Sequence, residues 1–207
     1  MQLQVAIDRV TLEEATALAK QLDPLVDIIE FGTSLVKDYG LLTLRDHPLH
    51  LQNAKLLIDL KTNDEGTYEF KQGYTTEAAI LTAMAASSHD TLEQVYNVSV
   101  QQGKEILIDL LEADSSRIAQ LTGFDQAIFG LHHSKDADVG FDAVATTAQF
   151  HRDFPQIKRL AVAGGINMEQ ASQLAQQDIA ETVIVGGEIV GSSDPVAAAK
   201  TFMEVIS

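Results

Sequence analysis

Eight short β-rich runs alternate with segments of helical periodicity along the whole chain, and this alternation restricts the possible folds more than any other feature. The runs are Leu3–Asp8, Val26–Phe31, Lys55–Leu60, Ala79–Met84, Lys104–Leu110, Gln126–Leu131, Arg159–Ala163 and Thr182–Val185. Between them, apolar residues recur at the three- to four-residue spacing that is typical of a helix with one buried face. Strands that alternate with helices form parallel sheets, so the pattern predicts an α/β fold.

Eight strand–helix units within 207 residues predict a (β/α)8 TIM barrel. A doubly wound open sheet is the main alternative, but it needs fewer strands than the eight that the sequence predicts. No linker, low-complexity tract or change of composition divides the chain, so residues 1–207 are expected to form a single catalytic domain. Local signals also predict helix ends: a capping box at Thr11–Glu14, a stop at Asp23-Pro24 and a start at Asp194-Pro195.

Composition excludes several classes of site and partner. The chain has no cysteine, which rules out disulfides, thiolate metal sites and thiol nucleophiles. Its formal charge of −16 repels phosphate backbones and anionic lipids, so neither nucleic acid nor a membrane is an expected partner. Neither a signal peptide nor a membrane-spanning apolar run is visible, and we expect a cytoplasmic protein. An anionic substrate then needs local groups, such as backbone amides at helix N-termini.

Ionisable residues stand at the predicted carboxyl ends of the strands, where the active site of a (β/α)8 barrel lies. In chain order these are Asp8, Glu30, Asp59 with Lys61, Asp109 and His132. Asp59 and Lys61 are two positions apart, so both are expected on the same face of their strand. A buried isolated charge is costly, so these groups need one another or a metal ion.

Glu30 and Asp59 supply the hard oxygen ligands that Mg²⁺ prefers, and Mg²⁺ leaves positions open for substrate oxygens. A purely structural ion pair of Lys61 is the alternative, but the convergence of several ionisable groups on one rim favours a functional site. His132 is the candidate acid–base catalyst because an ordinary imidazole titrates near neutral pH. His133 has the opposite strand parity and is expected to be solvated or structural. The remaining histidines are expected on the surface: His47, His50, His89 and His151.

Two glycine pairs, Gly164-Gly165 and Gly186-Gly187, follow the seventh and eighth predicted strands. In such barrels these strand ends often bind phosphate through backbone amides and the N-terminus of a short helix. Glycine permits close backbone approach and a positive φ. Either pair alone indicates only a tight turn, whereas two pairs at these two strands indicate a phosphate site.

Several segments resemble the orotidine-monophosphate-decarboxylase suprafamily. The resemblance lies in Gln4–Asp8, Val26–Thr33 and Asp59–Asp64, and the Asp-x-Lys-x-x-Asp pattern is its most specific mark. Ala161–Ile166 and Val183–Gly187 extend it into the C-terminal half. Within the suprafamily, the chain resembles the branch that holds 3-hexulose-6-phosphate synthase and 3-keto-L-gulonate-6-phosphate decarboxylase.

This resemblance implies a Mg²⁺-dependent carbon–carbon lyase that acts on a sugar phosphate through a 1,2-enediolate. It implies that Glu30 and Asp59 bind Mg²⁺, that Lys61 stabilises the enediolate oxygen and that His132 moves protons. The residue matching Asp64 reaches into the partner subunit's site, which implies a homodimer with shared active sites.

The two activities of the branch differ at a few positions. Asp109, Ala163 and Gly187 resemble the synthase, which adds formaldehyde to D-ribulose 5-phosphate. The decarboxylase has Glu, Thr and Arg there, and it converts 3-keto-L-gulonate 6-phosphate into L-xylulose 5-phosphate and CO₂. Conversely, His132–Ala137 resembles the decarboxylase, with Lys135 in place of its Arg. Three positions against one favour the synthase, with the decarboxylase as the first alternative.

Asn63 and Glu65 depart from the apolar and small residues of the resembled pattern, which leaves an altered substrate open. Two more functions stay open: a catalytically inactive phosphosugar-binding protein and a metal-independent phosphoribosyl isomerase. The complete set of acids and Lys61 argues against an inactive binding protein.

Overall fold

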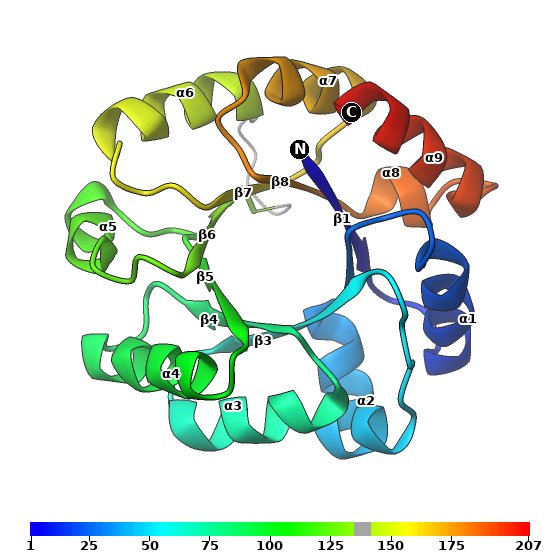
Figure 1. Cartoon of the computed structure of the whole chain (residues 1–207), viewed down its shortest axis with the longest axis horizontal. Coiled ribbons are helices and arrows are strands. Elements are labelled where there is room, and N and C mark those ends of the chain that lie inside the picture. The colour runs from blue at the N-terminus through cyan, green and yellow to red at the C-terminus, as the bar shows by residue number, and fades with distance from the viewer. Residues whose placement is uncertain (135–141) are drawn as a thin grey trace.

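The computed structural model describes residues 1–134 and 142–207, and the eight strands in these ranges close into a parallel barrel in chain order (Figure 1). The strands are β1 Gln2–Ile7, β2 Ile28–Phe31, β3 Lys55–Thr62, β4 Ile80–Met84, β5 Glu105–Asp109, β6 Ile128–His132, β7 Leu160–Ala163 and β8 Thr182–Val185. The predicted (β/α)8 barrel is confirmed, and every strand bound lies within two residues of its predicted position.

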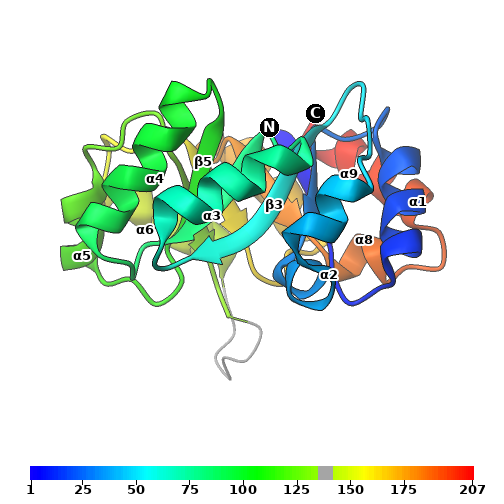
Figure 2. The same cartoon turned by 90° about the horizontal axis from the view of Figure 1, so that it is seen from below.

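Helices form a ring around the strands, and Figure 2 shows α3 and α4 packed side by side on the outside of the barrel. The helices are α1 Leu12–Leu22, α2 Thr33–Asp46, α3 Gly66–Gly73, η1 Tyr74–Thr76, α4 His89–Gln101, α5 Ser115–Leu121, α6 Ala143–Asp153, α7 Met168–Gln177, α8 Gly187–Val190 and α9 Pro195–Ile206. Within the described ranges, no helix combines the length and apolarity that crossing a bilayer requires.

The predicted helix ends are present. Thr11 and Glu14 form the capping box of α1, which ends at Leu22, one residue before Asp23. Asp194 caps α9, and Pro195 occupies the first turn.

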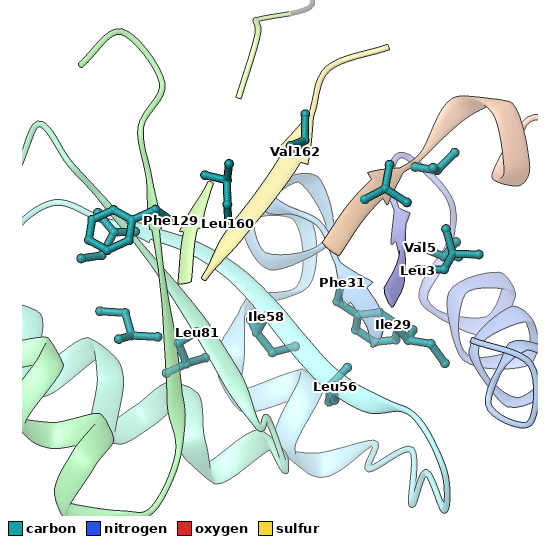
Figure 3. Packing of buried hydrophobic residues seen from close by; sticks show 14 of the residues in the cluster. Leu3, Val5, Ile29, Phe31, Leu56, Ile58, Leu81, Phe129, Leu160 and Val162 are labelled. Carbon is teal, nitrogen blue, oxygen red and sulfur yellow. The ribbon is translucent and has the colours of Figure 1, made fainter. Parts of the chain in front are cut away.

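Alternation along the strands produces two apolar layers. One lies between barrel and helices and includes the outward residues Ile29, Ile58 and Leu81 (Figure 3). The second layer fills the barrel interior and consists of Ile28, Leu57, Ile80, Leu107, Ile128 and Ala161. Because side chains alternate with period two, the residue two positions after each interior residue also points inward, toward the carboxyl end. These positions hold Glu30, Asp59, Thr82, Asp109, Gly130 and Ala163.

The opposite end of the barrel carries an ion-pair network. Arg159 donates two hydrogen bonds to Glu181, at 2.9 and 3.0 Å, and its Nη2 lies 2.8 Å from Glu105 Oε1. Lys55 pairs with the second Glu105 oxygen. The apolar interior layer therefore separates this network from the polar residues at the carboxyl end.

Candidate active site

One cavity of about 450 Å³ opens at the carboxyl ends of the strands. It brings together most of the residues that the sequence predicted for a site: Asp8, Glu30, Asp59, Lys61, Asp109, His132, Gly164, Gly165, Gly186 and Gly187. The six positions that follow the interior apolar layer all line this cavity. The barrel core thus positions the cavity wall directly.

Asp109 joins two of the predicted catalytic groups. Its Oδ2 accepts a hydrogen bond from Lys61 Nζ at 2.5 Å and lies 2.9 Å from His132 Nδ1. Its Oδ1 accepts the backbone N–H of Leu111 at 2.9 Å. Burial alone would raise the pKa of Asp109, but the hydrogen bond with His132 and the charge of Lys61 outweigh burial and lower that pKa to about 2. Asp109 is therefore a fixed negative charge between an ammonium and an imidazole.

Lys61 also contacts Asp59, whose Oδ2 lies 3.3 Å from Nζ. Asp59 accepts further hydrogen bonds from Thr33 Oγ1 at 2.6 Å and Thr82 Oγ1 at 2.7 Å. Burial favours the neutral amine of Lys61, but Asp59 and Asp109 outweigh it and raise the Lys61 pKa, so the ammonium stays charged.

The side chains of Asp59 and Lys61 meet as expected, but the strand between them is irregular. The register of β3 against β4 shifts between Ile58 and Thr62, and Lys61 has φ = 50°. Simple strand alternation therefore does not describe the backbone at Lys61. Non-glycine residues rarely adopt this left-handed conformation, and they do so mostly where surrounding contacts impose it.

Glu30 is a buried acid with a strongly raised pKa. It is 7% exposed, and its Oε2 accepts a 2.6 Å hydrogen bond from Gln4 Nε2. Burial and the nearby charge of Asp59 raise the Glu30 pKa to about 8. Ionisation of Glu30 beside Asp59 is therefore unfavourable without a compensating charge, and a divalent cation held by the two carboxylates would supply that charge.

Glu30 and Asp59 fit Mg²⁺ chemically. They offer hard oxygen ligands, and Mg²⁺ is commonly held by one or two carboxylates with water or substrate as its remaining ligands. Among the described residues, no set of three or more acidic or imidazole side chains forms a closed cation cage. This pair therefore fits a cation that keeps open positions.

Asp8 rests against the first turn of α2. Its Oδ1 accepts Ser34 Oγ at 2.8 Å and the Ser34 amide at 3.4 Å. Gly32, the N-cap of α2, makes this position possible, because a Cβ there would lie 2.2 Å from Asp8 Oδ1. Arg9 follows with φ = 55°, and its amide donates to Ser34 Oγ at 2.8 Å.

The two glycine pairs shape the rim differently. Gly164 and Gly165 have φ values of 120° and 65°, and a Cβ on Gly164 would lie 2.8 Å from the backbone oxygen of His133. Gly186 has φ = −110°, and Gly187 is the first residue of the short helix α8. The first pair therefore needs glycine for its conformation, while the second stands at the start of a helix, where the first backbone amides have no partner within the helix.

One predicted residue lies apart from this cavity. Asp64 is exposed in a separate surface depression that also contains Glu65 and Lys71. Lys135 lies outside the described residues. The expected surface histidines are all exposed: His47, His50, His89 and His151. His133 is half-buried beside Gly164.

Five residues that the sequence patterns did not predict for the site also line the cavity: Gln4, Thr82, Thr33, Ser34 and Arg9. Strand parity could have found Gln4 and Thr82, because both are polar residues at inward positions of apolar strands. Thr33 and Ser34 begin α2, where no local pattern identifies a site residue. Arg9 is exposed at the rim, and within the described ranges no carboxylate pairs with its guanidinium.

Comparisons with known proteins agree with this geometry. Residues 1–202 match the family described as Orotidine 5'-phosphate decarboxylase / HUMPS. A 3-hexulose-6-phosphate synthase of Staphylococcus epidermidis is 30% identical over 202 residues, which cover 97% of this chain and 96% of the relative. A crystal structure of 3-hexulose-6-phosphate synthase covers both chains completely, with a TM-score of 0.89 and 28% identity. A 3-keto-L-gulonate-6-phosphate decarboxylase from Vibrio cholerae shares the fold, with a TM-score of 0.84 and 23% identity over 99% of this chain and 96% of that one.

Proposed function

Because the chain belongs to the Orotidine 5'-phosphate decarboxylase / HUMPS family, we propose that it is a 3-hexulose-6-phosphate synthase. The prediction of a carbon–carbon lyase is confirmed, because relatives matched over the full length are named 3-hexulose-6-phosphate synthase. The observation that carries the proposal is the contact of Asp109 with both Lys61 and His132, in the cavity that also holds the Glu30 and Asp59 carboxylates.

D-ribulose 5-phosphate is the proposed substrate to which formaldehyde is added. Its phosphate would bind the backbone amides of the two glycine pairs, where the chain supplies N–H donors without side-chain obstruction. Glu30 and Asp59 would hold Mg²⁺. When bound, the cation would supply Lewis-acid stabilisation of negative charge on the ketose oxygens.

His132 is the proposed proton carrier. If Nδ1 donates to the Asp109 carboxylate, the lone pair of the ring lies on Nε2, which takes the proton from C1 of the ketose phosphate. Loss of this proton gives a 1,2-enediolate. The Lys61 ammonium, held charged by Asp59 and Asp109, stabilises its negative oxygen in a partly buried site.

Carbon–carbon bond formation then follows without further reagents. The C1=C2 electron pair of the enediolate forms the new bond from C1 to the formaldehyde carbon, the negative oxygen on C2 becomes a carbonyl again, and the C=O π electrons of formaldehyde move to its own oxygen. His132 Nε2 returns its proton to that oxygen, so the proton removed from C1 balances the proton added to the product.

The test is formaldehyde consumption by purified protein with D-ribulose 5-phosphate and Mg²⁺. We expect turnover by the wild type and a loss of roughly 1000-fold or more in Lys61→Ala, because the enediolate charge loses its ammonium. Lys200→Ala, on the exposed face of α9, is the control that should keep wild-type activity. A wild-type protein that consumes no formaldehyde contradicts the proposal.

The second candidate is the decarboxylase activity on 3-keto-L-gulonate 6-phosphate, which the segment His132–Ala137 favours. The same protein is assayed for CO₂ release from that substrate. If decarboxylation is the main activity, Lys135→Ala should reduce it more than it reduces aldol addition.

We also propose that Asp64 completes the site of a partner subunit, in a homodimer with shared active sites. Its exposure away from the cavity of its own chain is consistent with this role. Lys61→Ala and Asp64→Ala, each inactive alone, should recover roughly a quarter of wild-type activity when mixed and allowed to exchange subunits, because half of the dimers then contain one intact site. Absence of recovery in exchanged dimers contradicts a shared site.

A further inference from the structure

Thr82 is a buried polar residue on an otherwise apolar strand. Its neighbours Ile80, Leu81 and Ala83 are fully buried, and Thr82 itself is 3% exposed. A hydroxyl removed from water needs hydrogen-bond partners, and a valine would fill the same volume without that requirement. Packing alone therefore does not explain why a hydroxyl occurs at this position.

The Thr82 hydroxyl joins two residues of the proposed site. Its Oγ1 accepts the backbone N–H of Lys61 at 2.8 Å, and it donates to Asp59 Oδ1 at 2.7 Å. An amide N–H can only donate and an ionised carboxylate can only accept, so the direction of both bonds is fixed. The hydroxyl hydrogen thus points to Asp59, and an oxygen lone pair points to Lys61.

This hydroxyl stands where the strand ladder is interrupted. Ile58 pairs with Leu81, and the next pair is Thr62 with Ala83. Thr82 is therefore the one β4 residue opposite three residues of β3, those at positions 59–61. Lys61 adopts φ = 50° within this stretch, and the Thr82 side chain accepts its amide. The hydroxyl replaces a backbone acceptor where the regular ladder supplies none.

We propose that Thr82 is a positioning residue, whose hydroxyl holds the irregular Lys61 backbone and the Asp59 carboxylate in one arrangement. This arrangement directs Lys61 Nζ to the gap between Asp59 and Asp109. The consequence for turnover rests on the proposed function, whereas the effect on the Lys61 backbone does not.

Two substitutions separate the effect of the Thr82 hydroxyl from the effect of side-chain packing. Thr82→Val keeps the shape and removes the hydroxyl, and Thr82→Ser keeps the hydroxyl and removes a methyl group. Thr147→Val is the matched control, because Thr147 is fully buried on α6 and its hydroxyl has no partner among the described residues. If the valine variant at position 82 does not fold, Thr82→Ala against Thr82→Ser makes the same comparison.

The first measurement is amide hydrogen exchange at Lys61, which needs no substrate. We expect exchange to accelerate by roughly 10- to 100-fold in Thr82→Val, and to stay near the wild-type rate in Thr82→Ser and Thr147→Val. Unchanged exchange in Thr82→Val overturns the proposal.

The second measurement is the split between kcat and KM for the ketose phosphate. We expect kcat to fall by roughly 10- to 100-fold in Thr82→Val with KM within about threefold of wild type, and Thr82→Ser to restore most of kcat. Equal losses in the valine and serine variants overturn the proposal, because they indicate packing. If the wild type itself turns over no ketose phosphate, the proposed function fails, and hydrogen exchange at Lys61 still decides the role of Thr82.

Discussion

Replacing Gly32 by alanine tests whether Asp8 must rest against the first turn of α2. A Cβ at this position would lie 2.2 Å from Asp8 Oδ1 and 2.4 Å from its Cγ, closer than real Cβ contacts allow. The Asp8 carboxylate must therefore move by about 1 Å. The sequence predicts Asp8 as a catalytic residue, and a displacement of that size at a catalytic group lowers activity by roughly 100-fold. We expect kcat/KM of Gly32→Ala to fall by about this factor.

The fold should tolerate the same substitution. Gly32 has φ = −66° and ψ = 167°, which any residue adopts, and the group displaced is the far end of a half-exposed side chain. Loss of the hydrogen bond between Ser34 and Asp8 changes the free energy of unfolding by about 1 kcal/mol. Urea denaturation of Gly32→Ala should therefore show a small change in the free energy of unfolding, whereas kcat/KM falls strongly.

A double-mutant cycle with Asp8→Ala decides the mechanism. If Gly32 acts only by making room for the Asp8 carboxylate, Gly32→Ala changes nothing further in a chain that already carries Asp8→Ala. Gly123→Ala is the control, because a Cβ there meets no atom within 4 Å and φ is not positive. Wild-type kinetics in Gly32→Ala, or losses that multiply in the double variant, would refute the reasoning.

Three further results are expected. Asp23 accepts backbone N–H groups from the three residues 52–54 at 2.8 to 3.0 Å; burial raises the pKa of this carboxyl, but these bonds outweigh burial and lower it. The stabilisation by the ionised Asp23 carboxylate is therefore present above pH about 4 and is lost as pH falls through the lowered pKa. We expect the unfolding free energies of wild type and Asp23→Asn to differ by about 2 kcal/mol at pH 7, and this difference should shrink below pH 4. Urea denaturation at a series of pH values measures the difference. Chelation with EDTA should abolish formaldehyde consumption and Mg²⁺ should restore it, with Glu30→Gln and Asp59→Asn requiring more Mg²⁺; full activity in EDTA contradicts the metal assignment. Arg9→Ala should raise KM for the sugar phosphate by roughly tenfold with kcat unchanged, since Arg9 is a rim cation that no described carboxylate neutralises, and an unchanged KM excludes it from phosphate binding.

Strand order and the position of the cavity follow from periodicity in the sequence. The eight apolar runs and the capping signals at Thr11 and Asp194 depend on neighbours in the chain, so they can be read locally. Period two then places Glu30 and Asp59 inside the barrel at its carboxyl end. This is why the prediction of the fold and of these cavity residues needed no structure.

The contacts that hold those side chains are not local. Thr82 binds Asp59 and Lys61 across the β3–β4 pair. Asp109 on β5 joins Lys61 of β3 to His132 of β6, and Ser34 binds Asp8. Each contact depends on the register of segments more than 20 residues apart. The left-handed backbone of Lys61 also lacks a sequence signal, because lysine is not a residue that favours it.

The cavity wall presents more acid than base to an incoming dianion. Asp8, Glu30, Asp59 and Asp109 face the same space as Lys61, in a chain whose formal charge is −16. A phosphate ester must therefore approach against the long-range field, and it gains attraction only on reaching the proposed short-range donors of the rim, which are the backbone amides and Arg9. Added salt, which usually slows the capture of a charged ligand, would here hasten the encounter by shielding the repulsion.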